Sequence, residues 1–163
     1  MSESLQELSA ALSDPDVTRR RWAAEQLARH AAAASDAALA LVVAAGDDDD
    51  QVRQWTSSAL EDLGAPPATL VPQLAGMLSH SAPDVGYWAA TLLGRLGARA
   101  EPAVPQLAEA LAPSYALSVR ERAAWALGRL GPAASAAREA LQRAAASDER
   151  RLARVAREAL TRL

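Results

Sequence analysis

The sequence contains no cysteine and no phenylalanine, and aromatic residues make up only 4% of its 163 positions. Without cysteine, the chain has no disulfides, thiol nucleophiles or thiolate metal sites. β-Branched residues are sparse, which disfavours a sheet. No apolar run is long enough to span a membrane, and the opening residues Met1–Ser4 do not resemble a secretory signal. These absences predict a soluble, cytoplasmic, helical protein.

The stretch Val85–Leu111 has a pattern of apolar residues that is typical of two helices. Apolar residues follow two helical faces, namely Val85, Ala89, Leu93 and Leu96, then Val104, Leu107 and Leu111. Gly97 stands where a glycine closes a helix, and Pro102 and Pro105 stand where a second helix begins. The Gly-Arg-Leu-Gly segment 94–97 is therefore interpreted as a helix end. The stretch predicts a helical hairpin.

This hairpin recurs along the chain. Val-Pro-Gln-Leu-Ala occurs at 71–75 and 104–108, and Leu-Gly-Arg-Leu-Gly occurs at 93–97 and 127–131, with Gly64 aligned to Gly97. A period in this range indicates a stacked array of helix pairs. We call the first helix of each repeat A-type and the second B-type. The predicted division is a B-type helix in 1–13, repeats at 14–46, 47–79, 80–113 and 114–147, and an A-type helix at 148–163.

The fold predicted from this pattern is all-α, a single domain (1–163) forming a right-handed α-solenoid of about five repeats. Asp84-Val85, Ala89-Ala90, Leu93–Gly97 and Ala103–Leu107 together resemble a HEAT repeat. The resemblance is nearest to the short bacterial HEAT-like type named after phycobilisome lyases. It implies a scaffold that holds other proteins, with B-type helices lining the concave side.

Enzymatic relatives of such repeats are disfavoured by the residues present. Iron-binding HEAT hydroxylases use several His-Glu pairs, whereas this chain has only His30 and His80, neither followed by Glu. A bilin lyase activity has no cysteine or tetrapyrrole site to support it. We expect no enzymatic activity, no catalytic residue, no metal and no cofactor.

The acidic run Asp47–Asp50 allows two interpretations, a calcium site or a helix cap. Four carboxylates suggest calcium, but they lack the alternating ligand spacing of a calcium loop. The alternative is a helix cap followed by acids that the helix dipole favours. By the same reasoning Asp14 is expected to cap the helix that begins at Pro15. Arg19–Arg21 is expected on the outer surface.

Charge is distributed unevenly around the net value of −3. Residues 1–50 carry 10 acids and four arginines, and residues 114–163 carry five acids and 10 arginines. This polarity fits a partner of matching charge or head-to-tail contact, although drifting surface charge explains it too. A HEAT-like DNA glycosylase or another nucleic-acid binder is disfavoured because no continuous arginine stripe is present.

Two surfaces are candidates for binding a protein. The B-type helices should expose Gln73, Gln106, Glu109 and Arg143. The A-type helices offer Tyr87, Trp88 and Trp125, aromatic residues of the kind found in binding hot spots. Trp88 shares a column with Trp22 and Trp55 that is expected to fill grooves between repeats.

The function predicted from the sequence is a protein-binding scaffold that uses the curved face of the solenoid. The alternative is an assembly protein that forms homo-oligomers through 148–163, because Leu152, Val155, Leu160 and Leu163 have no following B-type helix to cover them.

Overall fold

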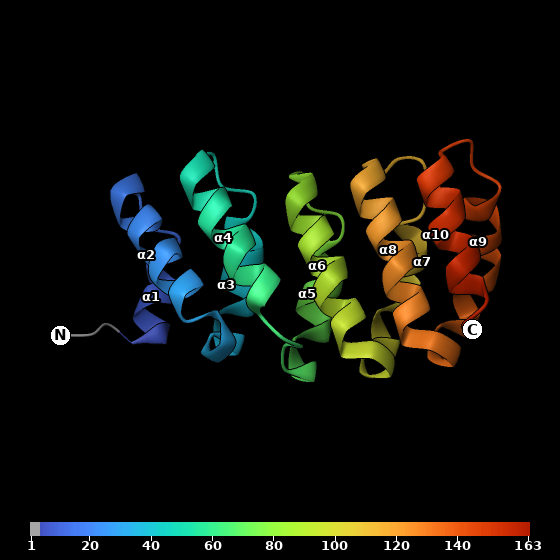
Figure 1. The fold of residues 1–163 in the computed structure, drawn as a ribbon, viewed down its shortest axis with the longest axis horizontal. Coiled ribbons are helices and arrows are strands. Elements are labelled where there is room, and N and C mark those ends of the chain that lie inside the picture. Colours follow the sequence, from blue (N-terminus) through green and yellow to red (C-terminus); the bar gives the residue numbers. More distant parts are fainter. Residues whose placement is uncertain (1–3) are drawn as a thin grey trace. The chain divides into compact units, whose positions relative to one another are not determined.

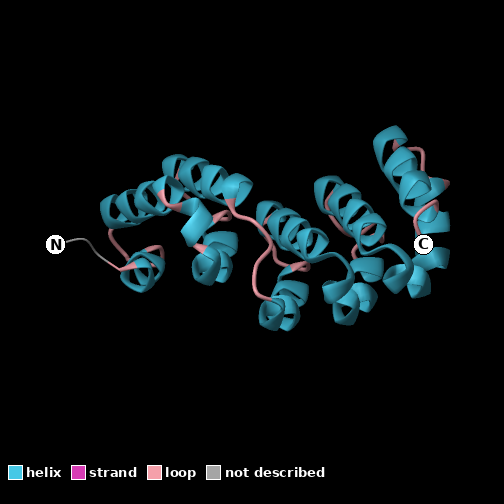
Figure 2. Cartoon of the chain, turned by 60° about the horizontal axis from the view of Figure 1, so that its bottom comes forward, coloured by secondary structure: helices cyan, strands magenta, loops and turns pink. Residues whose placement is uncertain are grey.

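The computed structural model describes residues 4–163, so residues 1–3 of the predicted opening segment lie outside it. Throughout the described residues every regular element is a helix and none is a strand (Figure 1, Figure 2). The chain divides into two compact units, Met1–Pro67 and Ala68–Leu163.

The first unit places two long helices side by side over two shorter ones (Figure 1). The long helices are α2 (Val17–Arg29) and α4 (Asp50–Asp62), and the short ones are α1 (Leu5–Ala11) and α3 (Ala38–Ala44). Two 3₁₀ turns, Ala31–Ala33 and Ser35–Ala37, join α2 to α3. Long and short helices therefore alternate, as A-type and B-type helices do in the predicted repeat.

The second unit continues this alternation. Its A-type helices are α6 (Pro83–Leu96), α8 (Leu117–Leu130) and α10 (Arg150–Leu160), and its B-type helices are α5 (Val71–Met77), α7 (Val104–Glu109) and α9 (Arg138–Ala145). The 3₁₀ segments are Ala68–Leu70, Gly97–Ala103 and Gly131–Ala137. Helix α8 packs between α6 and α10, and each B-type helix packs against the A-type helix that follows it (Figure 1).

The core of each unit is a column of leucines contributed by the A-type helices. The leucines at equivalent repeat positions are Leu27, Leu60, Leu93 and Leu127, and each is fully buried. Alanines on the same helices are also buried, which lets neighbouring helices approach closely. The predicted all-α, HEAT-like solenoid fold is confirmed in this pattern of burial.

Two glycines close the long helices of the second unit. Gly97 follows α6 with φ of 59°, and Gly131 follows α8 with φ of 62°. A residue with a Cβ is strained at such angles. The glycine at this point of the repeat therefore lets the chain leave the A-type helix and enter the 3₁₀ turn that leads to the B-type helix.

Gly64 does not repeat this geometry, although the sequence alignment places it with Gly97. Helix α4 ends at Asp62, its C-cap Leu63 is extended, and Gly64 has no positive φ. Pro66 and Pro67 follow, and each disfavours the helical region for the residue before it. The chain therefore cannot enter a 3₁₀ turn directly, and the boundary between the two units falls at Pro67.

The predicted cap at Asp14 is wrong by two residues. The N-cap of α2 is Asp16, whose Oδ1 accepts from the Thr18 amide at 2.9 Å. Asp14 instead accepts from the Asp16 amide at 2.8 Å. Asp14 thus shapes the turn before the helix, and the carboxylate that caps the helix comes after Pro15.

Candidate functional site

The B-type helices of the second unit present the first candidate surface. Gln73 of α5, Gln106 of α7, Glu109 at the end of α7 and Arg143 of α9 are all exposed, as expected. Gln73 and Gln106 occupy the same place in consecutive Val-Pro-Gln-Leu-Ala segments. In residues 4–163 neither glutamine side chain has a hydrogen-bond partner.

A pocket of about 300 Å³ opens beside Glu109 and Arg143, between α7 and α9, with Arg120 of α8 also at its wall. Ala108, Ala140 and Ala144 form its small apolar walls, and Glu109 and Arg143 stand among its lining residues. Arg143 donates to Glu139 at 2.9 Å on the exposed side of α9. The pocket can accept an apolar side chain, with a carboxylate and a guanidinium available for polar contacts.

The A-type helices present a different arrangement, centred on Arg122 of α8. The Arg122 guanidinium carbon lies 4.4 Å from the centroid of the Tyr87 ring and 4.9 Å from that of the Trp125 ring. Arg122 also donates to the Tyr87 hydroxyl. Tyr87 and Trp125 are therefore half-buried around a cation, whereas the sequence interpretation left them open to solvent.

A groove of about 210 Å³ runs along this arginine. Its walls include Tyr87, Arg122, Trp125, Glu121 and, from α10, Arg151 and Val155. Sequence reasoning did not single out Arg122. The available signal was its spacing, because Arg122 and Trp125 are three residues apart and therefore neighbours on one helix face.

Trp88 is separated from this groove. It is only 8% exposed and meets the Tyr87 ring edge-on, with centroids 5.3 Å apart. Trp22, in the same column of the repeat, is 36% exposed and lies under the Arg19 guanidinium. Trp88 fills a space inside the fold as expected, but Trp22 and Trp55, which is 38% exposed, keep open surfaces, so the expectation for this column is wrong at two of its three positions.

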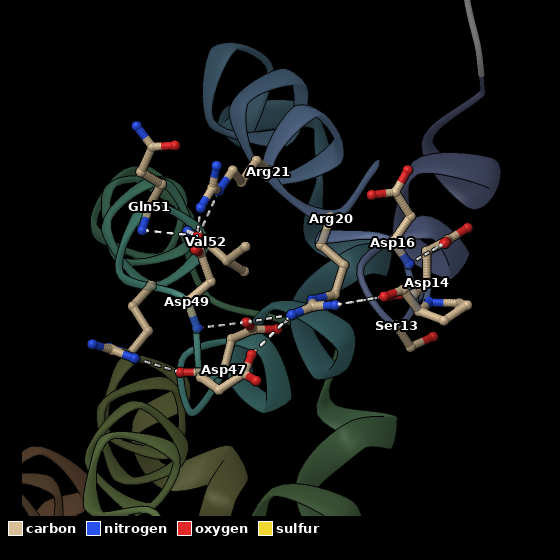
Figure 3. A network of polar contacts seen from close by, with 12 residues as sticks. Ser13, Asp14, Asp16, Arg20, Arg21, Asp47, Asp49, Gln51 and Val52 are labelled. Carbon is tan, nitrogen blue, oxygen red and sulfur yellow. Dashed lines mark hydrogen bonds and ion pairs between the residues drawn. The ribbon is translucent and has the colours of Figure 1, made fainter. Parts of the chain in front are cut away.

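The acidic run Asp47–Asp50 forms ion pairs with arginines of α2 (Figure 3). Arg20 donates to Asp47 through Nε at 2.9 Å and to Asp48 through Nη2 at 2.8 Å. Arg21 donates twice to Asp49, which also caps α4 through the Gln51 and Val52 amides. The expected helix cap is confirmed.

The expectation that Arg19–Arg21 lies on the outer surface is wrong for Arg20. Its side chain is only 15% exposed, and its Nη1 donates to the Asp14 carbonyl at 3.0 Å. Arg20 therefore ties the turn before α2 to the turn before α4 (Figure 3). Asp47, Asp48 and Asp49 are thus paired with arginines of α2, although acids still outnumber arginines in residues 1–50.

This network makes the first unit sensitive to acid. Burial acts to raise the pKa of Asp47, but hydrogen bonds from Arg20 and the Asp49 amide bring it below its ordinary value. Hydrogen bonds from Arg21 hold the pKa of Asp49 well below the ordinary range. A carboxylate with a lowered folded-state pKa stabilises the fold above its unfolded pKa of about 3.9, and that stability is lost as the pH falls through the folded value.

We expect the thermal unfolding midpoint of the first unit to decrease once the pH drops below about 4, because carboxylates of the unfolded chain gain protons there. Arg20→Met should lower the midpoint by a few degrees at pH 7 and flatten its dependence on pH. Thermal unfolding between pH 7 and pH 2.5, followed by Trp fluorescence, measures both effects. Arg29→Met is the control, because its pair with Glu25 is exposed and worth little. Equal acid sensitivity of wild type and Arg20→Met would contradict the assignment.

Helix α10 and the residues that follow it contain the leucines and the valine that the assembly alternative requires. Leu152 is fully buried against the preceding helices, and Val155, Leu160 and Leu163 are half-buried. The arginines of α10 are all exposed, namely Arg150, Arg151, Arg154 and Arg157.

No group of three or more His, Asp or Glu side chains in residues 4–163 is placed to hold a metal ion. Among the helices of this same range, none has both the length and the apolar character needed to cross a bilayer.

Known structures resemble this chain over nearly its whole length. The complex of CpcE and CpcF of phycocyanin lyase from Nostoc sp. PCC7120 matches with a TM-score of 0.69 and 24% identity, over 100% of this chain and 66% of that one. An engineered protein matches with a TM-score of 0.66 and 23% identity, over 99% and 79%. A designed armadillo repeat protein in complex with the peptide (KR)4 matches with a TM-score of 0.63 and 14% identity, over 96% and 80%.

At these identities the likeness to solved structures shows the fold alone. No curated protein matches the chain by sequence. The family model of HEAT repeats matches residues 38–117 and 71–161, which together span more than half of the chain. With its recurrent leucine column and its alternation of long and short helices, the chain belongs to the HEAT-repeat family.

Proposed function

We propose that this protein is a non-enzymatic binding module that holds an extended segment of a partner protein across α5, α7 and α9. The observation that carries the proposal is the pair Gln73 and Gln106. Both are exposed, both occupy the same repeat position, and neither has a hydrogen-bond partner among the described residues. A glutamine amide both donates and accepts, which matches the main chain of an extended peptide.

The spacing of the repeat suits such a ligand. Packed helices lie about 8–10 Å apart, and an extended chain advances about 3.4 Å per residue, so about three peptide residues span one repeat. Successive glutamines would then bond every third peptide residue. Beyond Gln106 the repeat has Ala140, which lines the pocket between α7 and α9. That pocket would receive a side chain of the segment.

The similar fold of a designed armadillo repeat protein in complex with the peptide (KR)4 supports the feasibility of this mode. The assembly alternative gains less support, because Leu152 is buried within its own chain. A lyase activity is not part of the proposal, since the likeness to phycocyanin lyase concerns the fold.

A library of random twelve-residue peptides, displayed on phage and selected against the intact protein, tests the proposal. We expect enriched peptides to bind Gln73→Ala/Gln106→Ala at least about tenfold more weakly, because two hydrogen-bonding groups are lost. The matched control is Gln51→Ala/Gln54→Ala, which removes two exposed glutamine side chains from α4.

Two outcomes would overturn the proposal. One is the absence of any peptide enriched above an empty support. The other is enriched peptides that bind both double variants equally well, which would place the ligand elsewhere on the molecule.

A further inference from the structure

The groove beside Arg122 contains a positive charge that no carboxylate of residues 4–163 neutralises. The Arg122 guanidinium is half-buried between the Tyr87 and Trp125 rings, and it makes no ion pair within residues 4–163. The ring faces stabilise a cation, but less than a carboxylate does. Arg122 can therefore bind an anion from another molecule.

The guanidinium itself determines how an anion can bind. It is planar and carries five N–H donors around its edge, and the Tyr87 and Trp125 rings lie beside it. The Tyr87 hydroxyl occupies one of these donors, and the others have no acceptor within the described chain. In-plane donors match the two oxygens of a carboxylate, which can accept in a bidentate manner.

A second arginine stands at the same groove. Arg151 of α10 pairs with Glu121 at a single N–O distance of 3.3 Å, and its side chain is 70% exposed. This contact is long for an ion pair, and Arg151 reaches it from solvent, whereas the Glu121 side chain is only 16% exposed. An incoming carboxylate could take Arg151 from Glu121 while also bonding Arg122.

The charge around the groove has the sign that such a ligand needs. Residues 114–163 carry 10 arginines against five acids. Arg150 of α10 and Arg162, which follows the helix, are exposed, and neither side chain has a partner within residues 4–163. The groove also holds Val155, which offers an apolar contact beside the charged one.

We propose that this groove binds the carboxylate of an Asp or Glu side chain in an acidic segment of a partner protein. The carboxylate lies between Arg122 and Arg151, and a neighbouring apolar side chain packs on Val155 and Trp125. A nucleic acid fits less well, because the rings are engaged by Arg122 and Glu121 stands at the groove wall. This surface is formed by A-type helices and is separate from the B-type surface of the proposed peptide mode.

The test uses a fluorescein-labelled peptide of glutamate, alanine and leucine, with the same peptide carrying glutamine in place of glutamate as its control. Fluorescence anisotropy at pH 7 and low salt measures binding to the intact protein. We expect the acidic peptide alone to bind, and Arg122→Gln to weaken it about tenfold. Arg151→Gln should weaken it less, and Glu121→Gln should strengthen it by removing the competitor for Arg151.

Matched variants separate a specific site from general charge attraction. Arg129→Gln and Arg162→Gln remove exposed arginines of α8 and of the chain end that lie outside the groove, and each should change affinity by less than about twofold. Tyr87→Phe keeps the ring and loses only the hydroxyl, so it should retain binding. Circular dichroism of each variant verifies that it is folded.

The proposal fails if the acidic peptide does not bind, or if Arg129→Gln weakens binding as much as Arg122→Gln. It also fails if a labelled single-stranded oligonucleotide binds more tightly than the peptide and loses affinity with the same two groove arginines, because the site would then be one for phosphate.

Discussion

Replacing Leu127 with alanine is expected to lower the free energy of unfolding of the second unit by about 2–5 kcal/mol. Leu127 is fully buried on α8, and α8 packs between α6 and α10. The loss combines the transfer of the deleted methyl groups with the cavity that they leave. Rigid neighbours on both sides of α8 limit the collapse of that cavity, which favours the upper part of the range.

The control on the same helix is Leu117→Ala. Leu117 begins α8 and is 38% exposed, so its truncation should stay within about 0.5 kcal/mol of wild type. Urea unfolding followed by circular dichroism and by fluorescence measures both variants. Equal effects at the two positions would mean that α8 is not the packed centre of the second unit.

The sequence was sufficient for the parts of the fold that repeat. Leu93 and Leu127 share one helical face at a fixed period, and a residue that recurs in this way in an apolar stripe belongs to the core. Gly97 and Gly131 predict the ends of α6 and α8, because the backbone there has positive φ, which favours glycine. Periodicity and local backbone chemistry are both visible in one dimension.

Contacts that do not repeat were invisible in the sequence. Arg20 meets Asp47 across 27 residues, and no periodic signal connects the two. The position of Arg122 between Tyr87 and Trp125 depends on how α6 and α8 face each other, which the sequence pattern does not specify. The exposed residues Gln73 and Gln106 were predictable as a surface, because helical phase alone places them opposite the core.

Gly94 illustrates the limit most clearly. It lies in the last turn of α6, as the interpretation of segment 94–97 as a helix end predicts, but its packing directly beneath Trp125 of α8 has no signal in the sequence. A Cβ at this position would lie 2.3 Å from Cζ3 of Trp125 and 3.1 Å from the Cα of Ala126. The glycine thus provides the space that Trp125 needs, and through it helps to position one wall of the Arg122 groove.

Replacing Gly94 with alanine should therefore destabilise the second unit by about 1–3 kcal/mol through overpacking, although alanine is the better helix former by up to about 1 kcal/mol. Trp125 must swing away or α8 must shift, and either change should move Trp fluorescence to longer wavelength. The matched control is Gly76→Ala in α5, where a Cβ has no atom within 4 Å. There only the helix preference acts, so Gly76→Ala should raise the urea midpoint while Gly94→Ala lowers it. If both variants were stabilised alike, Trp125 could not be packed against Gly94, and the groove beside Arg122 would lack the wall on which its binding of a carboxylate depends.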